Sequence, residues 1–156
     1  MAPLNLFRGR PRSERGAELI EFALVLPLLL LIVLGIVDFG FLFQRLEVVT
    51  NAAREGARLA VLPGYNTTDV TNRVQDYLQQ GGVGSDATNV NPHVDVSGPT
   101  DIPITGGGTF KGMQVSVRYF HQYLFLSGLN GIFGGAFSSV PLNATSTMRC
   151  ESACSP

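Results

Sequence analysis

One long apolar segment dominates the N-terminal third of the chain. Between Phe22 and Phe43 the only charged residue is Asp38, and the run Phe22–Val37 has no polar side chain. A helix of about 20 residues is enough to cross the roughly 30 Å of hydrocarbon in a bilayer. The segment is therefore long enough to span a membrane, and Asp38 is expected to mark the outer boundary between membrane and water.

After Asp38 the apolar pattern narrows to a single stripe. Its members recur at spacings of three and four, which is typical of a helix with one buried face. We expect one helix over residues 17–62, ended by Pro63 and Gly64, and Pro27 predicts a kink within it. The stripe consists of Phe39, Leu42, Phe43, Leu46, Val49, Ala53, Gly56, Ala57 and Ala60.

Four of these positions, Ala53, Gly56, Ala57 and Ala60, are small and allow another element to approach the helix backbone closely. The partner is either this protein's own folded domain or a neighbouring subunit. Packing within the protein is the favoured interpretation.

The remaining residues, 63–156, predict a small domain with one short helix and an antiparallel sheet. The helix is expected to be capped by Thr67, Thr68 or Asp69 and to end at Gly81-Gly82. The strand predictions rest on apolar residues that alternate with polar ones, and Pro141 indicates an edge strand. The segment 123–137 is expected to cover the sheet as a loop or short helix; the alternative is an exposed flap that binds a partner. The fold class is thus α+β, and the alternating series are Val94 and Val96; Met113, Val115, Val117 and Tyr119; and Val140, Leu142, Ala144 and Met148.

Positive charge is concentrated before the apolar run, at Arg8, Arg10, Arg12 and Arg15. Arginines that directly precede a membrane span keep that end in the cytoplasm. A nucleic-acid site is the alternative, but the position favours a role in topology, and we expect no nucleic-acid partner. The sequence predicts a single-pass protein of the cytoplasmic (inner) membrane, with its N-terminus inside and residues 63–156 periplasmic or extracellular.

The residues before the apolar run carry a processing pattern. A secretory signal peptide would show small residues at a cleavage site after the run, and residues 38–43 offer none. The stretch Gly16-Ala17-Glu18-Leu19-Ile20-Glu21-Phe22 instead resembles the class III leader of type IV pilins. That resemblance implies that residues 1–16 are a basic leader, which a prepilin peptidase removes by cutting between Gly16 and Ala17.

Glu21 is an acid at the edge of an apolar span, where a charged group is costly without a partner. After cleavage the α-ammonium group of Ala17 could pair with it within one helix, because the two residues are four apart. The resemblance implies a second arrangement, in which Glu21, followed by Phe22, pairs with the N-terminus of a neighbouring subunit during assembly. The second arrangement is favoured.

A closer resemblance extends along the helix. The segments Glu21-Phe22-Ala23-Leu24-Val25-Leu26-Pro27, Gly35-Ile36-Val37-Asp38-Phe39-Gly40 and Asn51-Ala52-Ala53-Arg54-Glu55-Gly56-Ala57-Arg58 are similar to the TadE-like family. Its members are pseudopilin-like proteins of the tight-adherence (Flp) pilus. The resemblance implies a minor pilin or pseudopilin that helps to assemble or initiate the pilus. Its expected partners are prepilin peptidase, other pilins or pseudopilins, the inner-membrane assembly platform and membrane lipid. The alternatives are a monomeric membrane-tethered binding module and the main subunit of a filament.

The sequence offers no catalytic constellation. His93 and His121 have no Cys or carboxylate at metal-ligand spacing, and Asp95 and Asp101 lack the pattern of a calcium loop. We interpret all four as solvated surface residues and expect no enzyme activity, metal or cofactor. Cys150 and Cys154 are the only cysteines, and a local disulfide between them is expected in an oxidising compartment.

Overall fold

The computed structural model describes residues 13–84, 92–131, 134–150 and 154. Most of the predicted leader, residues 1–12, therefore lies outside the described residues. By its contacts the chain forms two compact units, Met1–Val37 and Asp38–Pro156, called here the anchor unit and the folded unit. The elements are α1 (Ser13–Ala60), α2 (Thr67–Gln80), β1 (His93–Pro103), β2 (Thr109–His121), the 3-10 helix η1 (Leu126–Leu129) and β3 (Val140–Arg149).

The anchor unit contains the first part of α1, which remains helical through Pro27. Its apolar side chains point outward on all sides, and none of the most apolar window is buried. The side chains of Leu24, Ile32 and Ile36, for example, are all more than half exposed. This part of α1 is long and apolar enough to cross a membrane.

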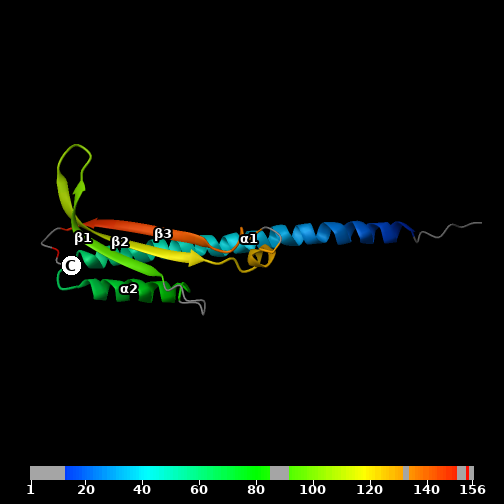
Figure 1. Cartoon of the computed structure of the whole chain (residues 1–156), viewed down its shortest axis with the longest axis horizontal. Coiled ribbons are helices and arrows are strands. Elements are labelled where there is room, and N and C mark those ends of the chain that lie inside the picture. Colours follow the sequence, from blue (N-terminus) through cyan, green and yellow to red (C-terminus); the bar gives the residue numbers. More distant parts are fainter. Residues whose placement is uncertain (1–12, 85–91, 132–133, 151–153, 155–156) are drawn as a thin grey trace, which may run out of the picture. The chain divides into compact units, whose positions relative to one another are not determined.

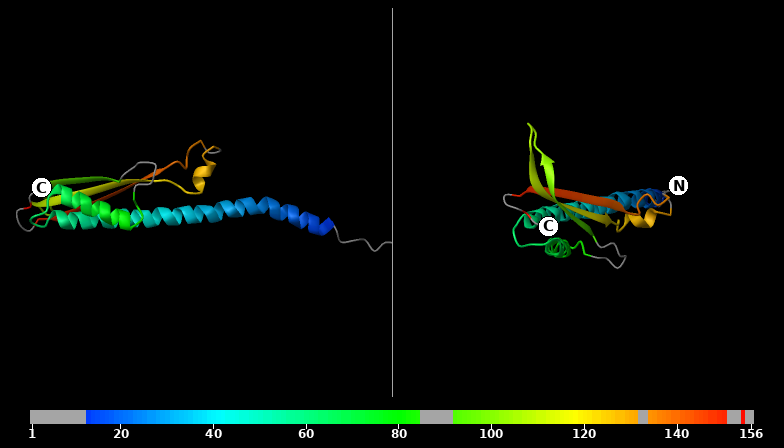
Figure 2. Two further views of the ribbon diagram at one scale, coloured as in Figure 1. Left: turned by 90° about the horizontal axis from the view of Figure 1, so that it is seen from below. Right: turned by 60° about the vertical axis from the view of Figure 1, so that its left-hand side comes forward.

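The folded unit is an α+β structure, as predicted. Its three strands form an antiparallel sheet in the order β1-β2-β3. The second part of α1 lies with α2 behind one face of this sheet (Figures 1 and 2). The register pairs Val94 with Val117 and Val117 with Ala144, so apolar residues of all three strands share the face toward the helices. Pro141 lies in β3, which is an edge strand, as its missing N–H requires.

The core of the folded unit is formed where the two helices meet β2. The stripe on α1 contributes small residues, whereas α2 and β2 contribute larger ones that fill the space between them. Glu55 also links the helices, because its carboxylate lies 3.1 Å from the Arg73 guanidinium of α2 and 3.4 Å from that of Arg58. The most buried members are Val49, Ala52, Ala53, Ala57 and Ala60 of α1; Val70, Val74 and Leu78 of α2; and Met113, Val115 and Val117 of β2.

The start of α2 differs from the prediction, which placed the cap at residues 67–69. Asn66 is the N-cap, and its side-chain oxygen accepts hydrogen bonds from the backbone N–H groups of Thr68 at 2.8 Å and Asp69 at 3.0 Å. The Asp69 carboxylate in turn accepts the N–H of Asn66 at 3.1 Å. This reciprocal capping box satisfies donors that the first helical turn leaves free, which explains why Thr67 is helical rather than capping.

The hairpin between β1 and β2 extends beyond the rest of the sheet (Figure 1). The pairing register shifts between Ser97 and Thr100, where one strand carries extra residues. Such a shift bends a strand and increases its local twist. Lys111 and Asp101 pair across this hairpin at 3.0 Å.

Candidate assembly and membrane-proximal sites

The residues predicted for cleavage and assembly all lie on α1 in the anchor unit. Gly16, Ala17, Glu21 and Phe22 are exposed, and Phe22 has 59% of its surface accessible. A Cβ atom added at Gly16 would meet nothing within 4 Å. Among the described residues the Glu21 carboxylate has no ion-pair partner. These positions are therefore accessible to a processing enzyme or to another subunit.

The small residues Ala53, Gly56 and Ala57 lie far along α1, in the core of the folded unit. Gly56 is the point where three elements converge. A Cβ atom there would overlap the Val74 side chain of α2 and would lie 3.1 Å from Cγ1 of Val115 in β2. Here the small side chains serve the packing of the protein's own domain, and Pro27 lies apart from them in the anchor unit.

Asp38 is the first residue of the folded unit, and its carboxylate binds the backbone of a distant loop. It is 1% exposed. Oδ1 accepts hydrogen bonds from the N–H of Leu124 at 3.0 Å and from that of Phe125 at 3.3 Å. Oδ2 accepts from the N–H of Phe125 at 3.0 Å and from that of Leu126 at 2.7 Å. We call this arrangement the Asp38 clamp.

The clamp explains how the loop after β2 is held. Successive backbone N–H groups that point to one spot form a favourable site for an anion, and the three amides at the start of η1 are used in this way. The segment 123–137, which was predicted to cover the sheet, instead binds α1 through its first residues. The sequence contains a signal that Asp38 has a partner. An acid next to an apolar run is costly without one, and this holds for Asp38 as well as for Glu21.

Aromatic side chains reinforce the same loop. The Tyr123 ring makes edge-on contacts with Phe39 of α1, with His121 at the end of β2 and with Phe137, at centroid distances of 6.2, 5.6 and 6.1 Å. Tyr123 is buried as a result. The loop is thus fixed both by its backbone, through Asp38, and by packed rings.

His121 was predicted to be a solvated surface residue, and this was wrong. It is 4% exposed, because its position in β2 places it on the face toward the helices. Its Nε2 atom has no hydrogen-bond partner in the described part of the chain. Burial lowers the pKa of the imidazole below its ordinary value of 6.5; the nearby Arg45 lowers this pKa further, while Asp38 opposes both effects.

Arg45 joins three parts of the folded unit. Its guanidinium donates hydrogen bonds to the Gly82 carbonyl after α2 and, at 3.5 Å, to the Tyr119 hydroxyl of β2. It also lies 6.0 Å from the centre of the Tyr119 ring. With Asp38 and His121 it lines an open hollow of about 370 Å³. The charge is therefore directed inward, toward the sheet and α2.

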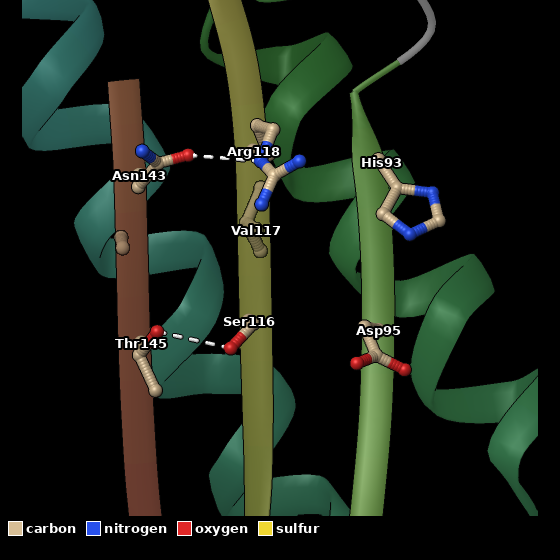
Figure 3. A pocket seen from close by; sticks show the side chains of 8 residues that line it. His93, Asp95, Ser116, Val117, Arg118, Asn143 and Thr145 are labelled. Atoms are coloured by element: carbon tan, nitrogen blue, oxygen red, sulfur yellow. Dashed lines mark hydrogen bonds between the residues drawn. The ribbon is translucent and has the colours of Figure 1, made fainter. Parts of the chain in front are cut away.

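The outer face of the sheet is polar and carries a second open hollow, of about 260 Å³. Figure 3 shows His93 and Asp95 side by side on β1, opposite Arg118 and Ser116 of β2. Arg118 Nε donates a hydrogen bond to Oδ1 of Asn143 at 3.2 Å. His93 and Asp95 are exposed, as predicted, and in the described residues no cluster of metal-binding side chains occurs here or elsewhere.

At the end of the chain, Cys150 and Cys154 form a disulfide. The backbone N–H of Cys150 donates a hydrogen bond to the Lys111 carbonyl at 2.9 Å. This contact continues the β2–β3 ladder and ties the start of the disulfide loop to the sheet.

Comparison with known proteins adds one match. A family model described as TadE-like protein matches residues 16–58. Residues 16–58 are thus similar to the TadE-like family. The resemblance read from the sequence is thereby confirmed for well under half of the chain, and the family is associated with pilus-related proteins. No curated protein and no solved structure matches the sequence.

The limits of the TadE-like segment coincide with features of the structure. It begins at Gly16, the residue of the predicted cut, and it includes Glu21 and Asp38. It ends at Arg58, two residues after Gly56, in the part of α1 that packs in the folded unit. The segment thus comprises the whole apolar part of α1 and the part that packs beneath the sheet, but neither α2 nor the strands.

Proposed function

We propose that the protein is a pilin-like structural subunit, a minor pilin or pseudopilin, that helps to assemble or initiate a tight-adherence pilus. The observation that carries the proposal is the TadE-like match, which begins at Gly16 and continues into the domain core. In this role the chain is a prepilin peptidase substrate, it acts without catalytic chemistry or cofactor, and its N-terminus lies in the cytoplasm.

The exposure of the anchor unit supports this role. Within the described residues, no apolar side chain of the most apolar window of α1 is buried, and most of those from Leu19 to Val37 are exposed. Water is an unfavourable solvent for such a surface, since each Å² of apolar area costs about 25 cal/mol to expose. Lipid covers it before assembly. Neighbouring pilin helices and the assembly platform replace the lipid when the subunit is extruded.

Glu21 gives this transfer its specificity. In the proposed assembly its carboxylate pairs with the α-ammonium group of Ala17 in a neighbouring subunit. Removal of one partner of a buried ion pair costs about 3–5 kcal/mol. Glu21→Gln should therefore be inserted and cleaved normally but should be recruited poorly to partner pilins, by about a hundredfold or more at 1.4 kcal/mol for each factor of ten.

Co-purification of tagged protein with partner pilins from detergent-solubilised membranes measures this recruitment. Glu18→Gln is the matched control, because Glu18 is an exposed acid on the same part of α1 but is only one residue from Ala17. Asp38→Asn would be a poor control, since Asp38 is buried and holds the loop after β2. Equal recovery of partners by Glu21→Gln and Glu18→Gln would reject the intersubunit pair.

The polar outer face of the sheet favours a second candidate, a membrane-tethered binding module. Its exposed groups of both charges, among them Asp95 and Arg118, suit a polar ligand. In this case the subunit remains monomeric in the membrane and keeps its leader. Sedimentation of the purified full-length protein as a monomer, with residues before Gly16 retained and no pilin partners, would favour this candidate over the first.

A further inference from the structure

Large apolar side chains are exposed on the folded unit beside the Asp38 clamp. On α1 they are Phe39, Phe41 and Phe43, with 47%, 42% and 65% of their surface accessible. On the loop after β2 they are Leu124 and Phe125, with 65% and 42% accessible. We call these five residues the apolar collar. Single exposed apolar residues are common on proteins, but five large ones around one short stretch of α1 and on the loop bound to it indicate a contact surface.

The two parts of the collar are held together by the contacts already described. Asp38 accepts hydrogen bonds from the amides of Leu124 and Phe125, and the Phe39 ring packs against Tyr123. The loop therefore cannot turn its apolar side chains inward without losing the clamp. The carboxylate satisfies the backbone N–H groups of Leu124, Phe125 and Leu126, while the side chains of Leu124 and Phe125 remain exposed.

The collar directly continues an apolar surface that lipid covers. Phe39 follows Val37, the last residue of the uncharged run, with only the buried Asp38 between them. The first exposed polar side chain on α1 beyond this point is Gln44, and Arg45 directs its charge to Gly82 and Tyr119. Residues 39–43 thus present only apolar side chains and a glycine to their surroundings.

We propose that the apolar collar inserts into the boundary between lipid headgroups and acyl chains, and that the Asp38 clamp fixes the loop after β2 in this position. Leu and Phe on an exposed face enter this boundary by about 5–10 Å. The lipid surface is thereby a second binding partner of the folded unit, separate from the spanning helix. It fixes the height and orientation of the sheet above the membrane. This inference requires membrane anchoring but does not depend on assembly into a pilus.

Tryptophan fluorescence tests the proposal, because the chain contains no Trp. Leu124→Trp and Phe125→Trp each introduce a single reporter into the collar of the full-length protein, reconstituted in phosphatidylcholine vesicles. Tyr65→Trp is the matched control, since Tyr65 is 45% exposed and lies after the end of α1, remote in sequence from both parts of the collar. Lipids brominated near the headgroup end of their acyl chains serve as contact quenchers.

The collar reporters should emit at shorter wavelength than Tyr65→Trp and should lose fluorescence to brominated lipid, because they lie about 5–10 Å into the boundary, whereas Tyr65→Trp should lose none. Asp38→Asn, added to Leu124→Trp, should reduce the quenching while the protein remains in the vesicles. The quenching should fall because the NH₂ group of asparagine replaces one carboxylate oxygen. It cannot accept the hydrogen bonds that this oxygen accepted from the backbone N–H groups of the loop.

Three results would overturn the proposal. Emission of both collar reporters at the wavelength of Tyr65→Trp would show that the collar faces water. Short-wavelength emission without quenching by brominated lipid would show that protein, such as a second copy of the chain, covers it instead. Unchanged quenching of Leu124→Trp after Asp38→Asn would show that the clamp does not hold the loop in the membrane boundary.

Discussion

Asp38 combines two properties that rarely occur together, a nearly complete burial and a position at the end of a membrane-length apolar run. Its charge is compatible with that burial because the loop after β2 supplies three backbone N–H groups. Hydrogen bonds to a charged group contribute about 1.5–3 kcal/mol each. Asp38 is thus the first residue of the folded unit, and it binds a segment of that unit that is distant in sequence.

His121 gives the folded unit a pH dependence that can be measured. Burial and Arg45 lower the pKa of its imidazole below 6.5, so near this pH the unfolded chain binds a proton more readily than the folded one. Stability is then highest above pH 6.5 and falls as the pH drops through 6.5 toward the lowered folded-state pKa. Thermal unfolding of the detergent-solubilised full chain, followed by near-ultraviolet circular dichroism, should show this loss.

His121→Phe should weaken that pH dependence, because phenylalanine keeps the ring contact with Tyr123 and cannot bind a proton. Carboxylates that titrate at lower pH leave a remaining slope in both proteins. An unfolding temperature that falls equally in the two proteins as the pH drops through 6.5 would contradict the role of His121.

At the residue scale, the sequence identified the small core positions and the exposed acids but missed Asp38 and His121. The reason is physical. The position of Asp38 next to an apolar run indicates that it needs a partner, but its partners are backbone amides more than 80 positions away, and almost every residue type carries such an amide. The burial of His121 follows from alternation along β2, since Tyr119 lies on the same face, and extension of the predicted apolar series by one step would have indicated it.

At the scale of the elements, α1 is one helix with two environments. Its first part is apolar on all sides and exposed, whereas its second part presents small residues to α2 and β2. The hydrophobic pattern already distinguished these two parts in the sequence. Likewise, the alternation of apolar and polar residues predicted the strands. The start of α2 was not predicted correctly, because Asn66, Thr67, Thr68 and Asp69 are all good caps and only the reciprocal bonds with Asp69 select Asn66.

The close contact at Gly56 predicts a specific sensitivity of this packing. Gly56→Ala should lower the free energy of unfolding of the folded unit by about 1–3 kcal/mol, the usual cost of overpacking a filled core. Val74 cannot move aside easily, because β-branched side chains are stiff. Chemical denaturation of the solubilised protein measures the change.

Gly40→Ala is the matched control for this substitution. Gly40 is also a helical glycine of α1 in the folded unit, but an added Cβ there meets nothing within 4 Å. Alanine is favoured over glycine within a helix by about 0.5–1 kcal/mol, so Gly40→Ala should leave stability unchanged or slightly raised. Similar losses for the two variants would mean that Gly56 is not a point of close contact.

At the scale of the whole molecule, the two units differ in how their apolar side chains are covered. The predicted division after residue 62 follows the elements, whereas by contacts the chain divides between Val37 and Asp38. The folded unit has its own core and a disulfide, and both stabilise its fold. The described part of the anchor unit has no such core, so in the proposed role its apolar surface is available first to lipid and then to neighbouring subunits.

The mature N-terminus of the protein, isolated from membranes and read by mass spectrometry, tests the central claim most directly. The account predicts a chain that begins at Ala17, and a Gly16→Leu variant that retains the residues before it. A Cβ atom at Gly16 meets nothing within 4 Å, and the same holds at Gly35, so Gly35→Leu is the control and should be cleaved normally. A wild-type protein that retains its leader, or a normally shortened Gly16→Leu variant, would contradict the assignment as a processed pilin-like subunit.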